Sequence, residues 1–163
     1  NQVTQNLFSK YSKPKDFATM PLNILKKLIY STGFYNNKSK SIKEMSITLI
    51  EEYGGELPLT LEEMVKLPGV GRKTANVVLG NVYGIPSIVV DTHVTRITNL
   101  LKFVRNKNAV KIEKELSKII DKTDWTLFSH LLIDHGRAVC IANRPQCNNC
   151  IIAQFCPSKL GDA

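Results

Sequence analysis

The four cysteines are the residues whose type and spacing most clearly allow chemistry. They all lie near the end of the 163-residue chain, in the pattern C-x6-C-x2-C-x5-C: Cys140, Cys147, Cys150 and Cys156. Thiols clustered in this way suggest a reducing compartment and a metal site rather than a disulfide framework. Four cysteine ligands satisfy either a tetrahedral zinc ion or a [4Fe–4S] cluster, and the spacing alone leaves both open.

A glycine-containing turn could bind an anion. The segment Leu67-Pro68-Gly69-Val70-Gly71 separates two helical patterns, and Arg72 and Lys73 follow it. Two glycines let the backbone turn sharply, and the N-terminus of the next helix directs amide groups and a positive dipole toward one place. A phosphate group fits such a place without a side chain. A plain helix-terminating turn between packed helices is the alternative.

Lys73 and Asp91 have the chemistry of a nucleophile and its partner. A neutral amine attacks carbon, and the first turn of a helix together with partial burial would favour the neutral form of Lys73. A phosphate-binding surface lysine is the alternative. Asp91 follows the apolar Ile88-Val89-Val90, where the simplest role is a helix N-cap. Because a carboxylate has two oxygens, Asp91 could both cap a helix and assist proton transfer or stabilise a cation.

Helices must position these residues, because apolar periodicity and capping residues predict helices nearly throughout the chain. We expect Pro14 to end the first helical segment and residues 32–37 to form a turn. We expect Leu131 and Leu132 to be buried in the last long helix. The other expected features are a capping box at Thr60 and Glu63, a helix from Gly71 to about Gly84, a buried crossing segment at 88–90, helices capped at Asp91 or Thr92 and at Asn108, and a last long helix from about Asp124 to Cys140. The sequence therefore predicts the all-α class.

Composition limits the possible partners. The chain carries 22 lysines and arginines against 14 acidic residues, a net charge of +8, and 43% of its residues are hydrophobic. This apolar fraction excludes a disordered or collagen-like chain, and no apolar run is long enough to predict a membrane span. The positive charge makes a polyanion the first partner to expect.

The hairpin segment 67–75 resembles the helix–hairpin–helix of the endonuclease III family of DNA glycosylases. The similarity continues in the same order through residues 90–96, through His135-Gly136-Arg137 and through the four cysteines. The resemblance implies a two-lobed all-α fold, with a helical barrel carrying the hairpin over residues 1–85 and an iron–sulfur cluster domain over residues 86–163. Family members have a further stretch before the position of Asn1. We therefore expect one barrel helix and the residues that probe the opposite strand to be missing from this chain.

The resemblance also implies an activity. The family pattern makes Lys73 the nucleophile and Asp91 the catalytic carboxylate, facing each other across the cleft between the lobes, and it makes the four cysteines the ligands of a [4Fe–4S] cluster. An oxidised or ring-saturated pyrimidine would be flipped out of the duplex and displaced by Lys73 at C1′. The resulting Schiff base would undergo β-elimination and cut the strand 3′ to the lesion. The chain is thus identified as a bifunctional DNA glycosylase and AP lyase of base excision repair.

Further residues are expected to contact DNA by the same resemblance. Phe34 matches the family's intercalating loop, where it would fill the space that a flipped base leaves, and a core aromatic is the alternative. His93 would line the base pocket, with a packed histidine as the alternative. The remaining expected contacts are the hairpin residues Leu67, Gly69, Val70, Gly71 and Arg72, and Arg137 and Arg144 beside or within the first cysteine loop.

The expected partner is double-stranded DNA that contains damaged bases or abasic sites. We expect a monomer without membrane contact, located inside the cell in the cytoplasm or nucleoid, or in the nucleus of a eukaryote. Two other functions stay open on the residues alone. One is a non-catalytic helix–hairpin–helix DNA-binding module with a structural metal, and the other is a glycosylase with a different base specificity.

Overall fold

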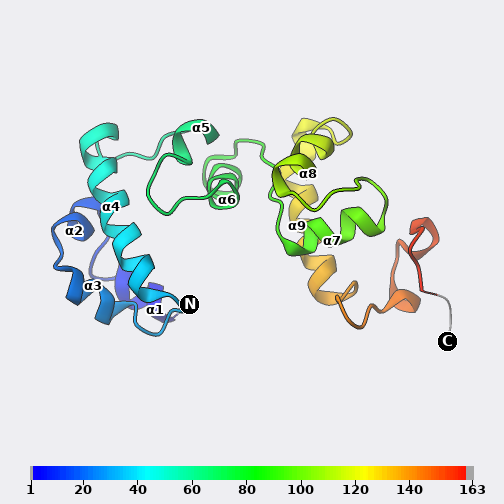
Figure 1. Ribbon diagram of the computed structural model, residues 1–163, viewed down its shortest axis with the longest axis horizontal. Helices are drawn as coiled ribbons and strands as arrows, with labels where there is room; N and C mark the ends of the chain where they lie inside the picture. Colours follow the sequence, from blue (N-terminus) through cyan, green and yellow to red (C-terminus); the bar gives the residue numbers. More distant parts are fainter. Residues whose placement is uncertain (1, 161–163) are drawn as a thin grey trace. The chain divides into compact units, whose positions relative to one another are not determined.

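The computed structural model describes residues 2–160, and in this part of the chain it contains α-helices and short 3-10 helices but no strand. The all-α class predicted from the sequence is therefore confirmed. No helix in residues 2–160 is long and apolar enough to cross a membrane. The α-helices, labelled in Figure 1, are α1 (Gln2–Phe8), α2 (Pro14–Thr19), α3 (Leu22–Leu28), α4 (Tyr35–Tyr53), α5 (Leu61–Met64), α6 (Arg72–Tyr83), α7 (Thr92–Leu100), α8 (Ala109–Leu116) and α9 (Trp125–Ala138).

The chain divides into two compact units, residues 1–75 and residues 76–163. The boundary falls inside the continuous helix α6, so that Lys73 belongs to the first unit and Asp91 to the second. The functional division expected from the sequence, a barrel domain over 1–85 and a cluster domain over 86–163, stays a prediction.

The first unit is built around the long helix α4, against which α2 and α3 pack (Figure 1). Its main apolar cluster joins buried side chains of α1, α2 and α3 and of the residues that directly follow α2 and α3: Leu7, Phe17, Met20, Leu25 and Ile29. Lys43 of α4 closes the end of α2, because its Nζ donates to the carbonyl oxygens of Ala18 (2.8 Å) and Met20 (2.7 Å). These contacts satisfy carbonyl groups that have no partner within a helix.

Two local expectations for the first unit are wrong. Pro14 opens α2 instead of ending a segment, because the first helical position needs no N–H donor. The side chain of Asp16 completes this helix start by accepting from the backbone N–H groups of Ser12 and Lys13, each at 3.0 Å. The expected turn at 32–37 is shorter than predicted, since α4 already begins at Tyr35.

The second unit packs α7 on α9 and has its own apolar core. The fully buried core members include Val94 and Ile97 of α7 and Ile112 and Leu116 of α8. Gly136 permits close contact between α7 and α9. A Cβ at this position would lie 2.7 Å from His93 Nδ1 and 3.0 Å from Ile97 Cδ1. Leu132 is buried as expected, but Leu131 is 59% exposed, so that expectation is wrong.

Candidate functional site

The hairpin turn is set by one glycine. Gly69 has a φ of +76°, and a Cβ there would lie 2.5 Å from the Cβ of Ser41. Both the backbone conformation and the lack of space therefore require glycine. The turn is closed by the Val70 N–H, which donates to the carbonyl of Leu67 at 3.0 Å. Leu67 as a whole is 2% exposed, and its N–H donates to the carbonyl of Met64 at 3.2 Å, so this residue supports the turn from inside the unit.

Gly71 differs from Gly69, because a Cβ at Gly71 would meet nothing within 4 Å. The internal packing of the protein therefore does not require glycine at this position. Gly71 also accepts the first hydrogen bond of α6, from the Ala75 N–H at 3.0 Å. The exposed backbone at the start of α6 is thus open to close approach by another molecule.

Lys73 lies in the first turn of α6, directly after the hairpin. The residue is exposed, so the partial burial expected from the sequence is not found. Arg72 beside it is half-buried. The helix N-terminus, the hairpin backbone and these two cations place positive charge and N–H groups on one end of α6.

Asp91 is the N-cap of α7, as predicted. Its backbone is extended, and its Oδ1 accepts from the Val94 N–H at 2.9 Å. Oδ2 has no hydrogen-bond donor among residues 2–160. Asp91 is half-buried, so the second oxygen can contact a ligand while the first caps the helix.

His93 and Arg96 connect α7 with the cysteine region. The His93 ring packs against Gly136 of α9, in agreement with the alternative of a packed histidine. Arg96 lies one turn later, and its Nη2 is 3.4 Å from His93 Nδ1. The other terminal nitrogen, Nη1, donates to Cys140 Sγ at 3.4 Å. Sequence reasoning does not place Arg96 in the site, since its partner lies 44 residues away in the chain.

The four cysteines line a single cavity of about 300 Å³ within the second unit, together with Arg96 and His135. All four are half-buried and free of disulfides. As placed, no group of three or more His, Cys, Asp or Glu residues in the part of the chain described could hold a metal ion. His135 Nε2 lies 3.7 Å from Cys150 Sγ. Burial, and then the nearby charge of Arg96, lowers the pKa of His135 and so favours its neutral form.

The other predicted contact residues are at the surface. Phe34 is 85% exposed and has a left-handed backbone, with a φ of 59°, at the start of α4. This excludes the alternative of a core aromatic. Arg137 and Arg144 are exposed, and the ion pair between Arg137 and Asp134 is long, at 3.8 Å. The cationic groups of both arginines are therefore accessible to a polyanion.

Comparisons with known proteins identify the family. Residues 1–122 match the family described as HhH-GPD superfamily base excision DNA repair protein. Endonuclease III of Bacillus subtilis (strain 168) is 46% identical over 157 residues, which cover 96% of this chain and 72% of that protein. For endonuclease III of Escherichia coli (strain K12) the identity is 38% over 159 residues, covering 98% of this chain and 75% of the relative.

Solved structures agree with these relatives. A non-covalent endonuclease III–DNA complex matches with a TM-score of 0.92 and 44% identity, covering 98% of this chain and 75% of that chain. A thermostable thymine-DNA glycosylase, 23% identical, has the same fold, with a TM-score of 0.88 over 97% of this chain and 75% of that chain. The chain therefore belongs to the endonuclease III family of DNA glycosylases and AP lyases, within the HhH-GPD superfamily of base excision DNA repair proteins.

Proposed function

We propose that the chain removes oxidised or ring-saturated pyrimidines from duplex DNA and cuts the strand 3′ to the site through a Schiff base on Lys73. The observation that carries this proposal is the position of Lys73, which is exposed in the first turn of α6 directly after the hairpin. A lysine placed there can reach a deoxyribose whose flanking phosphates are bound by the hairpin backbone.

The reaction begins with attack of the neutral Lys73 amine on C1′ of the sugar. The bond from C1′ to the base breaks, and the base leaves with the electron pair and takes up a proton. Asp91 stabilises the positive charge that develops on the sugar and accepts the proton released by the amine. The C1′–O4′ bond then breaks, O4′ takes up the proton held by Asp91, and the opened sugar is left as a protonated imine. Loss of a proton from C2′ expels the 3′ phosphate, which breaks the C3′–O bond.

The contacts to DNA follow from the surface residues. The amide groups of Gly69 and Gly71, with Arg72, bind a backbone phosphate beside Val70, and Gly71 leaves room for its approach. Phe34 enters the base stack and offsets part of the cost of flipping the damaged base, which is a few kcal/mol. Arg137 and Arg144 add phosphate contacts. His93, which is half-buried and two residues after Asp91, lines the pocket for the flipped base. We expect binding to weaken steeply with salt.

The four cysteines fit a [4Fe–4S] cluster better than a zinc ion. Zn–S bonds are about 2.3 Å long, so one zinc ion would draw the four sulfurs around a point. The cavity of about 300 Å³ that they line has room for a larger inorganic group. Such a cluster would cross-link the turns between Cys140 and Cys156 and hold Arg144 in place. The purified protein should be brown with broad visible absorption, and a colourless protein with stoichiometric zinc would contradict this assignment.

Borohydride trapping on an abasic-site duplex tests the central proposal. The wild type should form a covalent adduct, and Lys73→Gln should form none. Lys111→Gln is the matched control, because Lys111 is also an exposed lysine in the first turn of a helix. It should trap as well as the wild type. An intact, metal-loaded wild type that forms no adduct would contradict the lyase assignment and favour a DNA-binding module. We also propose that the protein is a monomer, and light scattering of the purified chain tests this. We propose that it acts inside the cell.

A further inference from the structure

The segment that leads to Asp91 is buried over its last residues and lies outside any regular element. Residues 84–91 lie between α6 and α7, and Ser87, Ile88, Val89 and Val90 are each less than 8% exposed. Backbone groups in such a segment need hydrogen-bond partners, because an unpaired buried N–H or C=O is costly. No neighbouring strand in residues 2–160 provides them. Side chains of two helices do so instead.

Asn76 of α6 supplies the first set of contacts. The residue is 3% exposed, and its Nδ2 donates to the carbonyl oxygen of Ile88 at 2.9 Å and to Glu113 Oε2 at 3.2 Å. In return, Ser87 Oγ donates to the backbone carbonyl of Asn76 at 2.7 Å. Both partners of the amide are acceptors, and its NH₂ group has the two donor hydrogens that they need. Asn76 therefore ties the segment to α6 and to α8.

Ser129 of α9 supplies the second set. It is 1% exposed, and its Oγ accepts from the Val89 N–H at 2.9 Å while donating to the Trp125 carbonyl at 3.0 Å. Thr126, one turn earlier on α9, accepts from the Ser87 N–H at 3.3 Å. Asn76 of α6 therefore holds the segment at Ile88, and Ser129 of α9 holds it at the next residue, Val89.

We propose that Asn76 and Ser129 are positioning residues for the reaction, because they fix the backbone that ends at Asp91. This inference rests on the roles proposed for Lys73 and Asp91. Asn76, Ser129 and Asp91 all belong to the second unit, so these contacts fix the carboxylate within that unit. Neither residue touches the substrate. They act by fixing the position of the Asp91 carboxylate. The reaction rate is very sensitive to that position, because reacting groups must be held in the right orientation.

Ser129→Ala is the cleanest test, because it removes one oxygen atom from a buried site and leaves the packing intact. Ser46→Ala is the matched control. Ser46 is 2% exposed, and its Oγ bonds only within its own helix, to the Ile42 carbonyl at 2.8 Å. Three quantities should be measured for each variant: Tm, the affinity for a duplex with a tetrahydrofuran abasic analogue, and the single-turnover rates of base removal and strand cleavage.

We expect Ser129→Ala to bind the analogue duplex like the wild type but to react about tenfold or more slowly. Asn76→Ala should show the same split between affinity and rate. Ser46→Ala should keep the wild-type rate even with a comparable loss of Tm. A wild-type rate in folded Ser129→Ala would overturn the proposal, as would equal rate losses in Ser129→Ala and Ser46→Ala.

The wild-type trapping result separates this inference from the proposed function. If the wild type forms the borohydride adduct and the Ser129 and Asn76 variants react at the wild-type rate, only the positioning role fails. If the wild type forms no adduct, both fail, because there is then no reaction to position. Amide exchange at Val89 gives an independent check. It should be faster in Ser129→Ala than in the wild type, and unchanged exchange would contradict the proposed hold on the segment.

Discussion

The two residues proposed to carry the reaction are held in opposite ways. Lys73 is exposed on the first turn of α6 and has a long, flexible side chain. Asp91 has a short side chain that is fixed as a helix cap at the end of a buried segment. The amine can thus follow the substrate, whereas the carboxylate can move only if the protein backbone moves. Substitution of Lys73 itself should therefore affect chemistry or binding alone, whereas substitutions that release the segment before Asp91 should lower the rate through geometry.

The largest effect should come from separating the two roles of Asp91. Asp91→Asn keeps a good N-cap but loses the charge, so we expect a rate about 10²- to 10⁴-fold lower with little change in Tm. Asp91→Ala should lose a comparable rate and about 1 kcal/mol of stability as well. Single-turnover kinetics and thermal unfolding measure both quantities. If Asp91→Asn reacts like the wild type, Asp91 is a cap only.

The two hairpin glycines should respond differently to the same substitution. Gly69→Ala places a Cβ against Ser41 at positive φ, so we expect a loss of about 1–3 kcal/mol in the free energy of unfolding. Gly71→Ala has open space and should keep the wild-type Tm, but it should bind duplex DNA about tenfold more weakly by obstructing a phosphate. Denaturant unfolding and fluorescence anisotropy distinguish the two. Unchanged affinity in Gly71→Ala would argue against phosphate binding at this turn.

The arginines near the cysteines should affect binding without affecting stability. Removing one phosphate contact lowers the slope of log K against log salt by about 1, and we expect this for Arg144→Ala and for Arg137→Ala. Tm should not change, because both residues are exposed and the Arg137–Asp134 pair is long. A salt titration of duplex affinity checks this. An unchanged slope would remove that arginine from the DNA interface.

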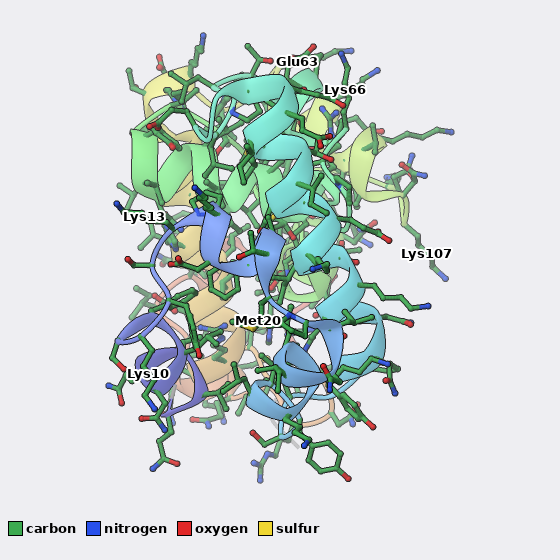
Figure 2. The ribbon with its side chains drawn as sticks, turned by 90° about the vertical axis from the view of Figure 1, so that its left-hand side faces the viewer. Lys10, Lys13, Met20, Glu63, Lys66 and Lys107 are labelled. Carbon is green, nitrogen blue, oxygen red and sulfur yellow. The ribbon has the colours of Figure 1, made fainter. Side chains whose placement is uncertain are left out.

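The smallest effect should come from the surface contacts of Glu63, in the helix that precedes the hairpin along the chain. Glu63 of α5 bonds Lys66 and accepts from Tyr53 Oη at 2.8 Å, and Figure 2 shows Glu63 and Lys66 at the same end of the first unit. The hydrogen bond from Lys66, and then that from Tyr53, lowers the pKa of Glu63. A carboxyl group whose pKa is lowered by folding stabilises the folded state at any pH above the ordinary pKa of glutamate. This stabilisation is lost as the pH falls through the lowered pKa.

Glu63→Gln should therefore have a slightly lower Tm than the wild type at neutral pH, and the difference should vanish in acid. The effect should be small because the groups are exposed to solvent. Thermal unfolding in buffers from neutral pH down through the ordinary pKa range of glutamate measures it. A difference that grows in acid would contradict a lowered pKa for Glu63.

Features with local signals could be predicted from the sequence. The caps at Thr60, Asp91 and Asn108 form, and each accepts from the backbone N–H three residues later. The reciprocal half of the capping box expected at Thr60 is not found among the described residues, because the Glu63 carboxylate bonds Lys66 and Tyr53 instead. A bond over three residues depends on residue type and position alone. The hairpin and the cysteine pattern are likewise contiguous motifs. Family membership could be inferred for the same reason.

Features that depend on tertiary contacts could not be predicted. Arg96 meets Cys140, and Ser129 meets Val89, across 44 and 40 residues of chain. A serine within a helical pattern gives no sign that its hydroxyl will accept a hydrogen bond from the backbone of a distant buried segment. Periodicity assigns Leu131 to the core, yet this residue is exposed because α9 buries only the narrower face that carries Ser129, Leu132 and Gly136. Periodicity gives the spacing of a face but not its width.

The contact between His93 and Gly136 has a consequence for how sequences of this family can vary. Any side chain at 136 meets the His93 ring, so a larger residue there can be accepted only where residue 93 is smaller. The two positions should therefore change together among descendants of a common ancestor. In a selection from a library randomised at both, Gly136→Ala should be recovered chiefly with a smaller residue in place of His93.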